Sequence, residues 1–182
     1  MTIPEIDRCL DKMTIIVDTR EQNTAAFRKR VAAMPCGVVR GKLLSGDYSC
    51  KTILPDDTEY TLENRFVIER KMSLGELCGN FCRGRARFER EFDRFIGGGG
   101  KACIIIENGN FEALRTHRYN SKMSPEALMA SVMAWYARYD VPVNFCKSES
   151  SGWLIYHLLR YQLREHLRRD FGEKETENVN NE

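Results

Sequence analysis

The sequence lacks the features that mark membrane, secreted and nucleotide-hydrolysing proteins. No apolar run approaches the roughly 20 residues that a membrane-spanning helix needs, and residues 1–12 mix acidic, basic and apolar side chains, unlike a secretory leader. The run Gly97–Gly100 has neither the preceding strand nor the following Lys-Ser/Thr of a phosphate-binding P-loop, so we interpret it as a flexible turn. No repeat or linker divides the chain. We therefore expect an intracellular protein with one domain over residues 1–172.

Nitrogen and sulfur ligands for a metal ion are also scarce. The three histidines, His117, His157 and His166, stand beside no candidate motif, and we expect them at surface or interface positions. The seven cysteines are scattered and form no Cys-x-x-Cys pair, so we expect buried, reduced thiols rather than a zinc site. A histidine-metal nuclease is disfavoured on the same grounds. Any metal site in this chain has to use oxygen ligands.

The formal net charge is only +2, which is low for a nucleic-acid-binding protein, but the charge is unevenly distributed. Residues 173–182 hold four acids and one lysine, a net −3, so residues 1–172 carry +5. We expect the acidic tail, 173–182, to be disordered. Basic residues cluster in two stretches, of which the first supplies candidate DNA contacts at Arg83, Arg85 and Arg87 and the second holds Arg160, Arg164, Arg168 and Arg169. Solvated helix faces explain the second cluster equally well.

Short apolar runs alternate with segments of helical periodicity along the chain. The predicted strands are 14–17, 38–44, 47–53, 66–71, 102–107 and 141–145, and the main predicted helices are 21–34, 73–96, 124–139 and 151–169, with a possible break at Gly84. We expect 38–44 and 47–53 to form an antiparallel pair joined by the Ser45-Gly46 bend. The nearly all-apolar 102–107 is typical of a central strand covered on both faces. The pattern predicts an α/β domain with a mixed sheet flanked by helices.

Three predicted strands carry charged residues at one terminus. The first strand ends in Asp18-Thr19-Arg20-Glu21, and the fourth ends in Glu69-Arg70-Lys71. The third strand begins at Gly46-Asp47. Because residues i and i+2 of a strand point to the same side, Glu69 and Lys71 lie side by side. Two acidic groups and a lysine can hold a hard divalent cation and position a water against a phosphodiester. The strand ends therefore indicate a metal-dependent nuclease site.

These three motifs, in this order, resemble the nuclease domain of the XPF family of structure-specific DNA endonucleases, to which the archaeal enzyme Hef belongs. The resemblance spans residues 13 to 168, with the diagnostic motifs between 17 and 71. It implies the restriction-endonuclease-like PD-(D/E)xK fold and hydrolysis that leaves 5′-phosphate ends. It also implies a Mg²⁺ or Mn²⁺ cofactor. The residues that it implies as catalytic are Asp18, Glu21, Asp47, Glu69, Arg70 and Lys71, with the four carboxylates as the metal ligands.

The resemblance also implies partners. DNA, branched or with single-strand/double-strand junctions, is the expected substrate, and Arg20 is a candidate phosphate contact. XPF-type nuclease domains pair through helices that follow the core strands, so we expect a homodimer or heterodimer through the last two helices, with Trp135 or Trp153 near the seam. No membrane partner is expected.

One position departs from the family pattern, which usually has an Asp four residues after the lysine. Here that position is Gly75, followed by Glu76, which could substitute for it. Three other interpretations stay open: a catalytically silent DNA-binding or scaffold subunit, a structural salt-bridge network at the sheet ends, and a nuclease acting on RNA. The intact motif acids and Lys71 argue against the silent subunit.

Overall fold

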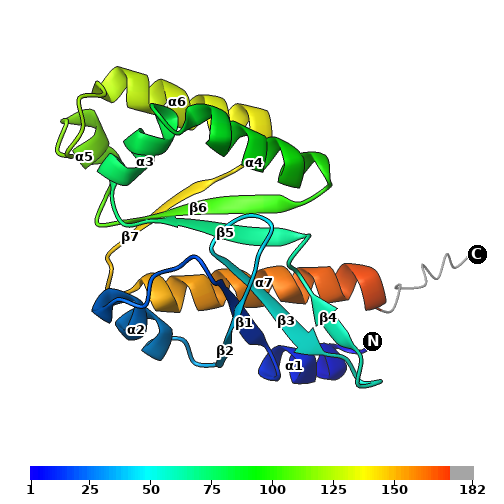
Figure 1. Cartoon of the computed structure of the whole chain (residues 1–182). Helices are drawn as coiled ribbons and strands as arrows, with labels where there is room; N and C mark the ends of the chain where they lie inside the picture. The colour runs from blue at the N-terminus through cyan, green and yellow to red at the C-terminus, as the bar shows by residue number, and fades with distance from the viewer. Residues whose placement is uncertain (173–182) are drawn as a thin grey trace, which may run out of the picture.

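A seven-stranded mixed sheet runs through residues 1–172, the part of the chain that this computed structural model describes (Figure 1). Its strands are β1 (Thr14–Asp18), β2 (Gly37–Gly41), β3 (Tyr48–Ile53), β4 (Glu59–Thr61), β5 (Phe66–Lys71), β6 (Lys101–Glu107) and β7 (Val143–Cys146). The spatial order is β2-β1-β3-β5-β6-β7, and β4 pairs with β3. The acidic tail expected over 173–182 lies outside the described residues.

Helices cover both faces of the sheet (Figure 1). One face carries α1 (Ile3–Asp11), α2 (Ala25–Ala32) and α7 (Ser151–Phe171), and the other carries α3 (Leu74–Phe81), α4 (Arg85–Gly97), α5 (Phe111–Arg115) and α6 (Pro125–Tyr139). Side-chain oxygens of Thr24, Ser73, Asn110 and Ser124 accept backbone N–H groups at the starts of α2, α3, α5 and α6. These caps satisfy donors that each first turn leaves free.

The sheet separates two apolar cores. Ile15, Val17 and Ile68 point into the core under α7, whereas Val67 and Ile104 point into the core under α3, α4 and α6. The alternation follows from the pleat, because neighbouring residues of a strand face opposite sides. Strand β6 is buried on both faces from Ala102 to Glu107, as its apolar sequence predicts. The prediction of a mixed sheet flanked by helices is confirmed.

The predicted pairing of 38–44 with 47–53 is wrong. Strand β2 instead runs parallel to β1, from Thr14 against Gly37 to Asp18 against Gly41, and β1 separates it from β3. The intervening α2 makes β1-α2-β2 a parallel crossover unit, which needs a helix-length connection rather than a tight bend. Since β1 is apolar on both faces, it is suited to a central position between two partners.

Smaller differences concern the ends of the chain and one histidine. Helix α1 was not expected from the sequence; a capping box between Thr2 and Glu5 starts it. His166 is buried against the core rather than at the surface. The long helix predicted from Ser73 is divided at Gly84 into α3 and α4. Within residues 1–172, no helix is long and apolar enough to cross a membrane.

The two C-terminal helices lie on opposite faces of the sheet, α6 with α3 and α4, and α7 with α1 and α2 (Figure 1). Trp135 of α6 is 1% exposed and packs among Phe81, Phe88 and Phe92, so it belongs to a core and is not available at a seam. Trp153 of α7 is 57% exposed. Of the two tryptophans expected near a seam, Trp153 is therefore the one at the surface.

Candidate active site

Backbone hydrogen bonds bring the three motif segments to one end of the sheet. The Asp18 N–H donates to the Asp47 carbonyl at 2.9 Å, and the Asp47 N–H donates to the Ile68 carbonyl at 2.8 Å. The Arg70 N–H then donates to a carboxylate oxygen of Asp47 at 2.8 Å. The ends of β1 and β5 thus meet at Asp47, which leads into β3. The convergence predicted from the sequence is present in the structure.

Gly46 fixes how Asp47 enters this site. Its φ is +71°, a left-handed conformation that side chains rarely adopt. A Cβ at this position would lie 2.7 Å from the Cβ of Val67. The turn therefore passes directly against β5, and this close approach places the Asp47 carboxylate beside Glu69.

Asp47, Glu69 and Lys71 form the centre of the site. Asp47 is half-buried, and desolvation together with the neighbouring Glu69 carboxylate raises the pKa of Asp47 well above its ordinary value. The Lys71 ammonium donates to one oxygen of Glu69 and lies 5.2 Å from the ring centroid of Phe88 on α4. Burial opposes the charge on Lys71, but the Glu69 carboxylate outweighs it and raises the pKa of Lys71. Lys71 is therefore a cation at neutral pH.

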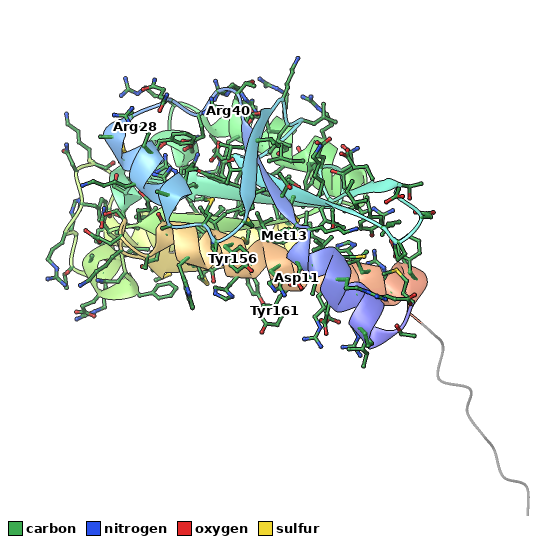
Figure 2. The ribbon with its side chains drawn as sticks, turned by 90° about the horizontal axis from the view of Figure 1, so that it is seen from below. Asp11, Met13, Arg28, Arg40, Tyr156 and Tyr161 are labelled. Carbon is green, nitrogen blue, oxygen red and sulfur yellow. The ribbon has the colours of Figure 1, made fainter. Side chains whose placement is uncertain are left out.

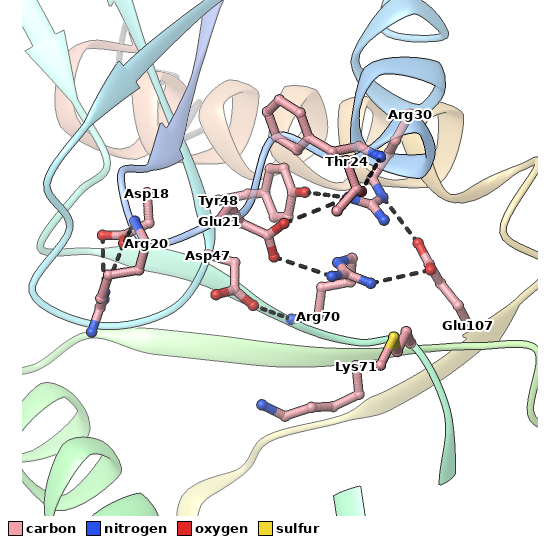
Figure 3. Close-up of polar contacts among 12 residues, drawn as sticks. Asp18, Arg20, Glu21, Thr24, Arg30, Asp47, Tyr48, Arg70, Lys71 and Glu107 are labelled. Atoms are coloured by element: carbon pink, nitrogen blue, oxygen red, sulfur yellow. Dashed lines mark hydrogen bonds and ion pairs between the residues drawn. The ribbon is translucent and has the colours of Figure 1, made fainter. Parts of the chain in front are cut away.

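Asp18 is held in a different way. Its carboxylate, fully buried, accepts the Leu43 N–H at 2.7 Å, the Arg20 N–H at 2.7 Å and two guanidinium N–H groups of Arg20 at 2.6 and 3.2 Å. Burial disfavours the charge, but these hydrogen bonds outweigh it and lower the pKa of Asp18. Figure 3 shows the Asp18–Arg20 pair standing apart from Asp47. Asp18 thus anchors the loop after β2, and Arg20 projects outward with 60% of its side chain exposed.

Glu21 belongs to a buried network of arginines and glutamates (Figure 3). The Arg70 guanidinium donates to Glu21 at 3.2 Å and to Glu107 at 3.1 Å. Arg30 of α2, only 4% exposed, donates to the other Glu107 oxygen at 3.0 Å and lies 3.7 Å from Glu21. The four side chains form a closed ring of alternating charge, which joins β5, β6, α2 and the loop after β1.

Two neutral groups complete the network. Arg30 donates to the Tyr48 hydroxyl at 2.9 Å and to the Ser151 hydroxyl at 3.2 Å. Burial raises the pKa of Tyr48 to about 12, so the phenol stays neutral. Tyr48 is fully buried and packs in the core, while its hydroxyl also fixes Arg30. Among the described residues, the buried Nε of Arg70 has no hydrogen-bond partner.

The four predicted carboxylate ligands are therefore divided between two environments. Asp18 and Glu21 are bonded to arginines, whereas one oxygen of Asp47 and one of Glu69 accept no hydrogen bond within residues 1–172. No group of three or more His, Cys, Asp or Glu side chains in this part of the chain is arranged to hold a metal ion. Asp47 and Glu69 thus each keep an oxygen that accepts no hydrogen bond and pairs with no arginine among the described residues, and these two oxygens are the candidate donors to a cation.

A hollow of about 350 Å³ opens over the site and is lined by residues of all three motifs, including Arg20, Glu21, Asp47 and Arg70. Glu76 lines the same hollow, but its carboxylate accepts the Met72 N–H at 2.7 Å and helps to start α3. At Gly75, a Cβ would lie 2.9 Å from the Asn120 carbonyl oxygen. The backbone around residue 120 therefore approaches too closely for the aspartate that the family pattern places there.

The three candidate DNA-binding arginines lie where α3 turns into α4. Arg85 pairs with Glu89 at 3.2 Å, and Arg87 pairs with Glu91 at 3.5 Å while 76% of its side chain stays exposed. Arg83 is exposed and makes no ion pair within residues 1–172. Since Phe88 of the same helix contacts Lys71, the start of α4 borders the candidate site.

Sequence reasoning missed Arg30 and underrated Glu107. Glu107 stands at the end of β6, and this position at a strand terminus marked it only as a supporting candidate. Arg30 lies in the basic run Arg28-Lys29-Arg30, which reads as an exposed helix face. The one available signal was its spacing of three from Phe27, because both residues face the core.

A mixed sheet that gathers an aspartate, a glutamate and a lysine at its strand ends defines the restriction-endonuclease-like fold. The chain belongs to the ERCC4 domain family, which matches residues 17–158. Two solved structures of XPF from Aeropyrum pernix share the fold. The first has a TM-score of 0.62 and 19% sequence identity, and the match covers 90% of this chain and 68% of that chain. The second, a complex with DNA, has a TM-score of 0.59 and 18% identity, and the match covers 84% of this chain and 66% of that chain. No curated protein matches the sequence.

The buried ring generates a prediction about stability. Glu107→Ala removes one of the two glutamates that Arg30 and Arg70 share and leaves Glu21 alone to face both buried cations, and we expect it to lower the free energy of unfolding by about 3–5 kcal/mol. Glu112→Ala, which breaks an exposed pair with Arg115, is the matched control and should cost at most about 1 kcal/mol. Urea denaturation measures both. Equal, small losses would show that the ring does not hold the site together.

Proposed function

We propose that this chain is a metal-dependent endonuclease that hydrolyses phosphodiester bonds in DNA. The observation that carries the proposal is the group of Asp47, Glu69 and Lys71 at one end of the sheet. Membership of the ERCC4 domain family supports it. A salt-bridge network alone accounts for Arg30, Arg70, Glu21 and Glu107. It does not account for Asp47, which makes no ion pair of its own within residues 1–172 and has a raised pKa, an arrangement that costs stability.

The open oxygens of Asp47 and Glu69 fit Mg²⁺ or Mn²⁺. Mg²⁺ keeps several waters and is usually held by one or two carboxylates together with substrate phosphates. Two acids are therefore enough, and Asp18 and Glu21 act by orienting the arginines around them. Bound there, the ion would neutralise Asp47 and Glu69, polarise the phosphate and make a bound water more acidic.

The remaining chemistry falls to side chains of this chain. Lys71, a cation, is suited to hold the attacking water and to stabilise negative charge that develops on the phosphate, rather than to act as a general base. Arg20, mostly exposed at the rim of the hollow, is suited to a DNA phosphate. Arg70 fixes the position of Glu21 and donates its backbone N–H to Asp47. These roles assign one function to each of the three motifs.

DNA is the proposed substrate, and branched or flapped DNA the proposed class within it. One XPF structure that shares the fold was solved as a complex with DNA. The exposed arginines at the start of α4 lie beside the site and would extend contacts along the backbone. An intracellular location follows from such a substrate. A panel of flap, splayed-arm, junction, plain duplex and RNA substrates, cut by the purified protein, tests this choice; equal cutting of plain duplex would remove the preference for branches.

The first prediction concerns the reaction. We expect cleavage to require Mg²⁺ or Mn²⁺ and to stop in EDTA, and Glu69→Gln and Lys71→Ala each to lower the rate by at least about 100-fold. Glu59→Gln and Lys51→Ala are the controls, because these two residues form a lysine–glutamate ion pair between β3 and β4 that is more exposed to solvent. Gel assays on flap DNA measure the rates. Full activity of Glu69→Gln would overturn the site.

The same acids give a readout that does not depend on activity. Because Asp47 binds its proton more tightly in the folded protein than in the unfolded chain, its charge destabilises the fold at neutral pH. In EDTA, Asp47→Asn should therefore raise the melting temperature at pH 7, and the difference should shrink as the pH falls toward the ordinary pKa of 3.8. Mg²⁺ should stabilise the wild type and not this variant. A melting temperature that Mg²⁺ leaves unchanged would argue against the metal site.

The second prediction concerns DNA binding. Neutralising Arg83 and Arg87 with glutamine should weaken binding and lower the slope of log K against log salt by about 0.9 for each DNA phosphate that the variant no longer neutralises. The control is Arg8→Gln with Lys12→Gln, two exposed cations of the α1 segment on the opposite face. Fluorescence anisotropy over a salt series measures the slopes. An unchanged slope in the α4 variant would mean that these arginines are only solvated.

The third prediction concerns self-association. We propose a dimer that uses α7 alone, where Trp153 and Tyr161 are 57% and 59% exposed, because aromatic side chains are enriched at interfaces (Figure 2 shows Tyr161 beside α1). Sedimentation at micromolar concentration should show a dimer that Trp153→Ala weakens. Tyr136→Ala on α6, an equally exposed aromatic, should have no effect. A monomer at every concentration would exclude the dimer.

A further inference from the structure

A second hollow, of about 530 Å³, lies at the start of β5 and β6, whereas the candidate active site lies at the other end of these strands. The hollow is formed where β5 and β6 begin, where α4 ends, and along the last turns of α7. Its lining includes Arg65, Lys101, His166 and Arg169, with the glycines 98 and 99 at its rim. Among the residues that the structure describes, the one acid of the lining is Glu165, which pairs with Arg168 at 3.6 Å. Nothing in the proposed hydrolysis uses these residues, so the hollow needs an explanation of its own.

Its cations are held in place by the fold. The Arg169 guanidinium donates to Asp170 at 3.0 Å, and Arg65 pairs with the same carboxylate while donating to the Tyr60 hydroxyl at 2.9 Å. Lys101 is fixed at the backbone, where its N–H donates to the Arg65 carbonyl at 2.8 Å. Among the described residues, its ammonium makes no ion pair. One carboxylate, that of Asp170, thus serves two arginines, and the lysine is left with its full charge.

His166 shows how closely these cations converge. It is 8% exposed, and burial together with Arg169, Arg65 and Lys101 lowers the pKa of His166. Its Nδ1 lies 2.7 Å from the Arg169 guanidinium, which can only donate, so Nδ1 accepts and the neutral ring carries its proton on Nε2. The wall of the hollow therefore offers donors from Lys101, Arg169 and the imidazole, a set that suits an anion with several oxygens.

The glycine run supplies shape rather than donors. The N–H groups of Gly98, Gly99 and Gly100 already donate to carbonyls of α4, so the loop is not a backbone cradle for phosphate. No atom lies within 4 Å of the place where a side chain of Gly99 would begin. The absence of side chains here keeps the entrance beside Lys101 open to a bulky ligand.

A third hollow, of about 240 Å³, extends from this place toward the active site. It shares Asn64 and Gly98 with the basic hollow, carries Arg94 on its wall, and reaches Ser45, two residues before Asp47. Strand β5 runs between the two ends; its six residues, at about 3.3 Å each, span about 20 Å. A DNA strand covers that length in about six nucleotides.

We propose that the basic hollow binds a backbone phosphate of the same DNA molecule, about six nucleotides from the phosphodiester at Asp47 and Glu69. This inference rests on the proposed function and adds a second point of contact to it. Lys101 and Arg169 supply the charge, His166 supplies a neutral donor, and Arg94 lies along the path. Two contacts this far apart set a minimum length for the duplex arm that the protein grips.

The test measures affinity against arm length. Fluorescence anisotropy in EDTA is recorded for duplexes of 4 to 16 base pairs and for flap substrates whose arms grow in the same steps. Three proteins are compared: the wild type, the hollow variant Lys101→Gln/Arg169→Gln, and the control Arg8→Gln/Lys12→Gln. We expect wild-type affinity to rise once an arm exceeds about six base pairs. The hollow variant should lose about tenfold on long arms and nothing on short ones, with a salt slope lower by about 0.9, because one phosphate is no longer neutralised. Lys101→Gln alone, which breaks no ion pair, should show part of the same affinity loss on long arms.

Three results would overturn the inference. The first is a wild-type affinity that shows no step as the arm grows, and the second is an equal loss of affinity by the hollow variant on short and long arms. The third is that inorganic phosphate protects the wild type against thermal unfolding while the hollow variant binds DNA as tightly as the wild type, which would mark a site for a free anion. Failure of the proposed function looks different. A protein that cuts nothing with Mg²⁺ but shows the step keeps the hollow as a DNA contact, whereas normal cutting without the step removes the hollow alone.

Discussion

The ring of Arg30, Glu107, Arg70 and Glu21 is the constraint on which the rest of the site depends. Its members come from α2, β6, β5 and the loop after β1. Each charged side chain therefore has its partners of opposite charge only when these four segments have packed together. A buried charge without its partner is costly, which ties the position of each segment to the others. The backbone N–H that Arg70 donates to Asp47 extends this constraint to the carboxylate at the centre of the site.

The ring also explains why acids so close together differ in character. Arginines neutralise Asp18 and Glu21, which lowers the electrostatic cost of placing them near the sheet end. Asp47 and Glu69 share only Lys71, and the pKa of Asp47 rises in consequence. The charge left uncompensated is therefore concentrated on two carboxylates, which is where a divalent cation gains most from binding.

The sequence was informative where local patterns determine structure. The apolar strands, the cap at Ser73 and the charged strand ends predicted the sheet, the start of α3 and the meeting of Asp47 with Glu69 and Lys71. It was uninformative where partners lie far apart in the chain. The pairing of β2 with β1 depends on how α2 crosses the sheet, and the burial of Arg30 depends on Glu107, 77 residues away. Contacts between residues so far apart in the chain do not show in the local periodicity of apolar residues, from which helices and strands are predicted.

Strand β5 gives the protein a further property. Glu69 and Lys71 emerge on the face covered by α4, whereas Arg70 emerges on the face covered by α2 and α7. Three consecutive residues thus face both cores in alternation, and the packing of one core alone does not position all three side chains. A chain that has packed only one side of its sheet has the motif but not the arrangement. A newly made or partly unfolded molecule therefore lacks the complete group of Glu69, Arg70 and Lys71 until both sides of the sheet have packed.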